Sequence, residues 1–146
     1  MIRAAALEQI LHTEIPISRA MGICIAGYDG TNLKLDAPLA PNTNHKRTAF
    51  GGSLYSLAVL CGWCLLHLRL AEVKLHKHIV IQESRIRHLH PVEHDLHAEC
   101  RLNDAAFRHF LLTLKKHGRA RISLDVIINQ DNRPAVEFSG RYVVHG

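Results

Sequence analysis

The spacing of apolar residues along the chain predicts both helices and strands. Apolar positions three and four apart over residues 3–13 predict a short amphipathic helix, with one face formed by Ala6, Leu7, Ile10 and Leu11. Apolar and charged residues alternate over 32–38, which predicts a strand. It pairs with a strand at 23–28, because Asp29-Gly30 between them is a strong turn signal. Residues 49–68 differ from both patterns, since they contain no Asp, Glu, Lys or Arg.

That long apolar run could be a membrane span or the core helix of a globular protein. A span needs about 20 predominantly apolar residues. Here the first part of the run carries Gly51, Gly52, Ser53 and Ser56, and the most apolar stretch, 54–66, is shorter than a span. A helix that is hydrophobic on all sides is also what the centre of a globular fold requires. We therefore predict a buried central helix and no membrane span.

The second half of the chain predicts four further strands, over residues 79–88, 95–102, 122–128 and 136–144. A helix is predicted over 104–117, capped by Asn103 or Asp104 and ended by Gly118. Strict alternation in the first of these strands groups Ile79 and Ile81 with three charged residues, Glu83, Arg85 and Arg87.

This order of elements predicts an α+β fold in a single domain over residues 1–146. Antiparallel neighbours joined by short turns imply one curved sheet. A single very apolar helix then has one obvious place, against the concave face of that sheet.

Composition and charge add expectations about partners and location. The chain is 47% hydrophobic and 21% charged, and its formal net charge is +5. A basic surface favours an anionic partner, either a nucleic acid or a phosphate-bearing small molecule. Because Lys and Arg are scattered and no basic helix is interleaved with aromatic residues, we do not expect a nucleic-acid partner. The start of the chain lacks a signal-peptide pattern and the four cysteines do not form a disulfide framework, so we expect a cytoplasmic protein.

Two stretches of the chain resemble a known family. These are Ala49-Phe-Gly-Gly-Ser-Leu-Tyr-Ser-Leu-Ala58 preceded by Asn44-His45, and the segment 87–95 around Pro91-Val92. Together with the element order they resemble the hotdog-fold thioesterases, in particular the thioesterase-like domain at the C-terminus of YiiD-type proteins. The resemblance covers nearly the whole chain. It implies a hotdog fold, a curved antiparallel sheet wrapped around one long apolar central helix.

The same resemblance implies an assembly and a substrate class. The assembly is a homodimer, or a dimer of such dimers, in which two sheets join into one longer sheet. The substrates are acyl thioesters of coenzyme A or acyl carrier protein, bound at the subunit interface. No cofactor is expected beyond the coenzyme A or phosphopantetheine that belongs to the substrate.

The residues at the start of the central helix suit thioester hydrolysis. That reaction needs donors directed at the developing oxyanion and a base near the carbonyl. The first turn of a helix offers unpaired N–H groups, and Gly51 and Gly52 let a ligand approach them closely. We predict an oxyanion hole at these two glycines, with close helix-to-sheet packing as the structural alternative. Asn44 would orient water or the carbonyl, and His45 is the leading base candidate, although a His45 that only holds the loop is equally compatible.

Substrate contacts are predicted in two places. Around the start of the helix they are Asn42, Phe50, Ser53 and Ser56, although first-turn serines also serve as caps. The densest basic group contains Lys115, Lys116, Arg119 and Arg121. It would contact coenzyme A phosphates or an acidic carrier protein, or it would only complement the dipole of a helix end.

The chain departs from a related group of enzymes at two positions. Phenylacetate-type hotdog thioesterases have a His where this chain has Phe50, and an acidic catalytic residue where it has Val59. Val59 favours the alternative of a module that binds acyl-CoA or acyl carrier protein without hydrolysis. A hydratase or dehydratase of the same fold is least supported, because the required His and acidic pair is missing.

Two other patterns are interpreted as structural. Cys61-Gly-Trp-Cys64 has the spacing of a redox motif, but it lies inside the apolar helix, which favours core packing. Histidines recur between residues 76 and 97 without the spacing of a known zinc site, so we expect a polar sheet face and no metal.

Overall fold

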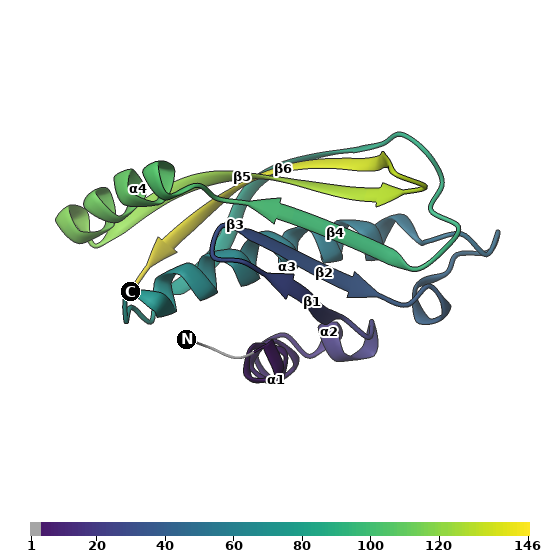
Figure 1. Cartoon of the computed structure of the whole chain (residues 1–146), viewed down its shortest axis with the longest axis horizontal. Coiled ribbons are helices and arrows are strands. Elements are labelled where there is room, and N and C mark those ends of the chain that lie inside the picture. Colours follow the sequence, from purple (N-terminus) through teal and green to yellow (C-terminus); the bar gives the residue numbers. More distant parts are fainter. Residues whose placement is uncertain (1–3) are drawn as a thin grey trace.

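A computed structural model describes residues 4–146 and shows one sheet curved around a long helix (Figure 1). The helices are α1 (Ala4–Glu14), α2 (Ile17–Ala20), α3 (Gly51–Glu72), α4 (Asp104–His117) and the 3-10 helix η1 (Ala40–Asn42). The strands are β1 (Cys24–Tyr28), β2 (Asn32–Ala37), β3 (His78–His88), β4 (Leu96–Arg101), β5 (Arg119–Gln130) and β6 (Arg133–His145). The predicted α+β arrangement is confirmed, and α2 and η1 are additions to it. Of the first predicted helix, residue 3 lies outside the described residues, and Leu7 and Leu11 form its buried face.

The sheet has the strand order β1-β2-β4-β5-β6-β3, and every neighbouring pair is antiparallel. The strand that follows α3 in the chain, β3, therefore does not join the sheet beside β2. It crosses to the far edge and pairs with the last strand. Its outer edge carries backbone groups that no other strand of residues 4–146 pairs.

Helix α3 is the centre of the core, as predicted. It is long and apolar enough to cross a membrane by length and composition, but 67% of its most apolar window is buried inside the fold. Tyr142 of β6 lies against its middle, where Gly62 leaves room for the ring. The Tyr142 hydroxyl donates a hydrogen bond to the Val59 carbonyl (2.7 Å). The apolar character on all sides thus reflects burial in the fold.

Strand β3 corrects the prediction of strict alternation. Its register with β6 shifts between Ile81 and Glu83, which leaves Gln82 unpaired in a β-bulge. One extra residue moves all later side chains to the opposite face. Ile79 and Ile81 therefore share the helix-facing side with Ser84, Ile86 and His88, whereas the charged residues Glu83, Arg85 and Arg87 face away from the helix.

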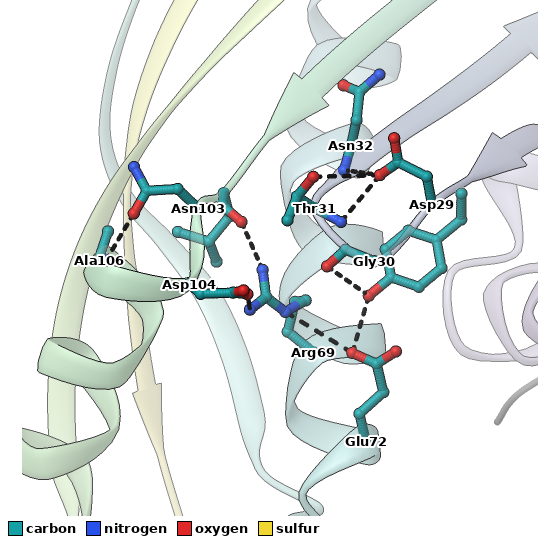
Figure 2. Close-up of polar contacts among 11 residues, drawn as sticks. Asp29, Gly30, Thr31, Asn32, Arg69, Glu72, Asn103, Asp104 and Ala106 are labelled. Carbon is teal, nitrogen blue, oxygen red and sulfur yellow. Dashed lines mark hydrogen bonds and ion pairs between the residues drawn. The ribbon is translucent and has the colours of Figure 1, made fainter.

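Helix α4 is fixed to the C-terminal end of α3 through Arg69 (Figure 2). Although only 5% exposed, Arg69 donates to the Leu102 carbonyl and to Asp104 Oδ1 (2.8 Å). Its guanidinium carbon lies 4.4 Å from the centre of the Phe107 ring. Glu72, one turn along α3, accepts a hydrogen bond from the Tyr28 hydroxyl (2.9 Å). This cluster joins α3, the start of α4 and the β1–β2 turn.

The ends of α4 agree with the prediction from sequence. The Asn103 side chain accepts a hydrogen bond from the backbone N–H of Ala106 (2.8 Å), so Asn103 rather than Asp104 is the cap. At the other end Gly118 adopts a left-handed conformation (φ 72°), and its N–H donates to the Leu114 carbonyl. Strand β5 then begins at Arg119, earlier than predicted.

Candidate functional site

The start of α3 presents backbone donors that the helix itself does not use. Phe50 occupies the N-cap position in an extended conformation, and no side chain caps the helix. The Phe50 N–H donates a hydrogen bond to the Asn42 carbonyl (2.7 Å). The first hydrogen bond of the helix is donated by the Leu54 N–H to the Phe50 carbonyl. Helical geometry leaves the N–H groups of Gly51, Gly52 and Ser53 without an acceptor within the helix. The positive end of the helix dipole lies at the same place.

The predicted polar loop lies next to this helix start, but the side chains of its two asparagines are hydrogen-bonded elsewhere, either within the loop or to residues that precede it. The Asn42 side chain is buried and donates to the carbonyls of Met21 (2.9 Å) and Pro38 (2.8 Å). The Asn44 carboxamide accepts from the backbone N–H groups of Lys46 (2.8 Å) and Thr48 (3.2 Å) and donates to the Thr48 hydroxyl (2.8 Å). Asn42 thus anchors the loop and Asn44 shapes its turn.

The remaining residues predicted near the helix start differ in their surroundings. His45 is exposed on the turn that Asn44 shapes. The Phe50 side chain is 55% exposed, and its ring covers Gly52 so closely that a Cβ there would clash with it. The Ser56 hydroxyl donates back to the Gly52 carbonyl (2.9 Å), and Ser53 is half-buried in the first turn.

A pocket opens beside the helix start, and it contains a histidine that sequence reasoning did not place there. Its lining residues come from the loop, from α3 and from the end of β3: Thr48, Ala49, Gly51, Leu54, His88, Leu89, His90, Pro91 and Val92. The His88 ring is the nearest neighbour of Gly51, with Cε1 3.8 Å and Nε2 4.0 Å from the point where a Cβ would lie. One feature of the sequence could have predicted the direction of His88. Ile86 is apolar and lies between Arg85 and Arg87, which indicates that even-numbered residues face the core at this end of β3.

A seam runs from this pocket along α3 and β3. On the helix it follows residues at four-residue intervals: Gly51, Tyr55, Val59, Trp63 and His67. The hydroxyl groups of Tyr55 and Ser84 are hydrogen-bonded across it (2.8 Å). At its far end the rings of Trp63 and His67 stack (5.1 Å between centres), and a second pocket is lined by both rings with His76 and His78. Burial, followed by the nearby His76, lowers the pKa of His67.

The predicted basic group lies at the opposite end of α3 from Gly51. Lys115 and Lys116 are exposed in the last turn of α4, and Arg119 and Arg121 are exposed on β5. Helix α3 has 22 residues and is about 33 Å long, and the start of α4 is fixed to Arg69 near its C-terminal end, so α4 lies toward the end of α3 opposite Gly51 (Figure 1). Within one chain, the structure does not bring the two predicted parts of the site together.

The cysteines of α3 lie in the core. Cys61 and Cys64 are fully buried, and burial raises the pKa of both thiols. Such thiols are not activated for redox chemistry. Throughout residues 4–146, no three His, Cys, Asp or Glu side chains are grouped closely enough to hold a metal ion.

Comparison with known proteins identifies a family and several solved structures that this chain resembles. The family model described as "Putative thioesterase (yiiD_Cterm)" matches residues 4–146. A protein of unknown function from Chlorobaculum tepidum is 34% identical and superposes with a TM-score of 0.92, covering 97% of this chain and 93% of its own. A protein from Shewanella oneidensis described as a "putative thioesterase" is 30% identical, with a TM-score of 0.88 and coverages of 98% and 97%. A thioesterase from Haemophilus influenzae, at 16% identity, a TM-score of 0.76 and coverages of 99% and 91%, shows the fold alone. The hotdog fold is confirmed.

Proposed function

The chain belongs to the thioesterase family of the YiiD C-terminal domain, and on that premise we propose that it hydrolyses acyl thioesters at the start of α3. The observation that carries the proposal is the uncapped first turn, which leaves the N–H groups of Gly51, Gly52 and Ser53 without an acceptor in the helix, next to a pocket that Gly51 lines. Donors fixed in this way stabilise negative charge that develops on a carbonyl oxygen.

The reaction needs few groups. A water oxygen attacks the thioester carbonyl carbon, and the charge that forms on the carbonyl oxygen is stabilised by the N–H groups of Gly51 and Gly52. The carbon–sulfur bond then breaks, and the thiolate takes up a proton. Asn44, whose side chain shapes the turn before α3, would orient the water or the carbonyl. His45 on the same turn remains a candidate for the base.

The seam between α3 and β3 supports an acyl substrate. Tyr55, Val59 and Trp63 give it a half-buried, mostly apolar helix side that begins at Gly51. An acyl chain attached to the carbonyl at Gly51 would follow this seam and remove apolar surface from water. The carrier, coenzyme A or acyl carrier protein, would then remain at the surface of the molecule.

A dimer would bring the distant basic group to the site. If two copies pair through their open β3 edges by a two-fold axis, their α3 helices run in opposite directions side by side. The start of one α3 then lies near the end of the other. Lys115, Lys116, Arg119 and Arg121 of each chain would approach the site of its partner and contact the phosphates of the carrier.

The alternative is a module that binds acyl thioesters without hydrolysing them. Val59 favours it, because this half-buried residue stands on the seam where related enzymes have a carboxylate. Both functions require binding of the same acyl thioester, and they differ only in whether the thioester is hydrolysed.

Gly51 offers a sharp test, because its N–H can be removed without breaking the helix. Proline is well tolerated at the first helical position, and Phe50 already has the extended conformation (φ −64°, ψ 133°) that a following proline requires. We expect Gly51→Pro to lower kcat for acyl-CoA hydrolysis by roughly 10²–10³-fold. Gly51→Ala keeps the N–H and has room for its Cβ beside His88, so it is the matched control.

The assay is release of free thiol across acyl-CoA chain lengths, with binding of each acyl-CoA measured by calorimetry. Equal turnover in Gly51→Pro and Gly51→Ala would contradict the oxyanion role of this donor. Tight binding with no turnover by the unmodified chain, unchanged in Asn44→Ala/His45→Ala, would instead establish the binding module.

A further inference from the structure

The His88 side chain lines the pocket beside Gly51. It is the last residue of β3, and the bulge at Gln82 turns its side chain toward α3. Its Nε2 lies 4.0 Å from the Cβ position of Gly51, whose N–H is a proposed oxyanion donor. No hydrogen bond of residues 4–146 involves the His88 ring, so its nitrogen atoms are available to water.

Neither of the other nearby histidines is placed as well. His45 is exposed, as His88 is, but it does not line the pocket. His90 also lines the pocket, but it belongs to the loop after β3. Its backbone N–H donates to the Ala135 carbonyl (3.2 Å). Among the described residues that line the pocket, His90 is the other titratable group, and α3 contributes none.

We propose that His88 is the general base of this site, an inference that rests on the proposed hydrolysis. Neutral His88, with its proton on Nδ1, accepts a proton at Nε2 from the attacking water as the water oxygen bonds to the carbonyl carbon. The charge moves to the carbonyl oxygen beside Gly51. When the tetrahedral adduct collapses, the carbon–sulfur bond breaks, and the imidazolium returns the proton to the leaving thiolate. The products are a carboxylic acid and a free thiol, and His88 is neutral again.

A base supplied by His88 accounts for the absence of catalytic side chains at Phe50 and Val59, where related enzymes have a histidine and an acidic residue. Related enzymes supply catalytic side chains from positions on or next to the central helix. Here the base comes from β3, and its ring lies beside Gly51. A chain of this kind needs neither a histidine at position 50 nor a carboxylate at position 59.

The test compares His88→Gln and His88→Ala with His109→Gln, which changes an exposed histidine on α4 at the far end of α3. We expect both His88 variants to lose kcat by roughly 10²–10⁴-fold while KM changes little. The acidic limb of the pH–rate profile, set by a histidine base, should flatten, and added imidazole should restore part of the rate of His88→Ala. His109→Gln should behave as the unmodified chain does.

The binding of a non-hydrolysable acyl-CoA thioether, measured by calorimetry, shows whether the pocket is intact in each variant. Turnover by His88→Gln within about threefold of the unmodified chain would overturn the role of His88 and leave the hydrolysis standing. A larger loss in His45→Gln than in His88→Gln would assign the base to His45 instead. An unmodified chain that binds acyl-CoA without turnover would overturn both proposals together.

Discussion

At the scale of single residues, one glycine determines how closely the sheet approaches the central helix. The ring of Tyr142, which is fully buried, lies against α3 at Gly62 and reaches the carbonyl of Val59 with its hydroxyl. A Cβ on Gly62 would overlap that ring. Burial raises the pKa of the Tyr142 hydroxyl, which therefore remains a neutral donor to the Val59 carbonyl.

We expect Gly62→Ala to destabilise the protein despite the better helix propensity of alanine. Alanine gains up to about 1 kcal/mol over glycine in a helix interior. Overpacking against Tyr142 costs about 1–3 kcal/mol, and displacement of the ring breaks its hydrogen bond, at about 1 kcal/mol. The net loss should be roughly 1–3 kcal/mol, measured by urea denaturation. Gly27→Ala is the control, since no atom lies within 4 Å of its Cβ position. A Gly62→Ala variant as stable as its parent would show that the ring does not restrict this position.

Local signals predicted some of these residues and not others. Asn103 and Gly118 were predicted to bound α4 because a cap and a left-handed stop depend on neighbours in the chain. The role of Gly62 depends on Tyr142, which is far away in sequence, so no local pattern reveals it. His88 was missed for a related reason, because its direction depends on the bulge at Gln82.

At the scale of elements, α4 packs on the fold through its buried residues Phe107, Phe110 and Leu114, and Arg69 ties the start of α4 to α3. That side chain is buried, whereas its partner Asp104 has a side chain that is 68% exposed. The ion pair with Asp104 is therefore screened by water and contributes little. The hydrogen bond to the Leu102 carbonyl and the contact with the Phe107 ring are enclosed, so they make up most of what Arg69 itself contributes.

This difference predicts unequal effects of the two partners. Arg69→Met keeps an apolar stem but leaves the Leu102 carbonyl without its donor, so we expect a loss of roughly 1–3 kcal/mol in the free energy of unfolding. Asp104→Ala should cost less than about 1 kcal/mol, because it removes an exposed ion pair. Chemical denaturation of the two variants measures both values. An Asp104→Ala loss as large as that of Arg69→Met would show that the ion pair, and not the buried contacts, is the main contribution of Arg69.

The order and type of the main elements were predictable because each has a clear period. Helix α3 has an uninterrupted apolar run, α4 has a stripe of apolar residues, and the strands are separated by turn residues. The short elements α2 and η1 were missed, because four and three residues are too few to show a period. The place of the candidate site was predictable, since the glycines start the helix, whereas the composition of its pocket depends on which strand lies beside it.

At the scale of the whole molecule, the sheet ends in an open strand of 11 residues, β3. Natural proteins protect such edges with charges or cover them. The outward charges Glu83, Arg85 and Arg87 protect one half of β3, but Val80 in the other half is 49% exposed. Beside it, Trp63 and His67 form a half-buried surface at the end of the seam. A second copy of the chain, paired through β3, would cover both features.

We therefore expect light scattering to give at least twice the 16.4 kDa mass of one chain. Val80→Asp places a charge on the open edge without disturbing the core, since the side chain is already exposed, and should weaken the dimer by tenfold or more, on the order of 1.4 kcal/mol. Leu112→Asp is the matched control, because Leu112 is 69% exposed on α4, away from the β3 edge. If turnover requires the basic group of the partner, the activity of Val80→Asp should fall on dilution as dimers separate. A monomeric parent chain with full activity would contradict the shared site, and it would place the whole reaction within the pocket of a single chain.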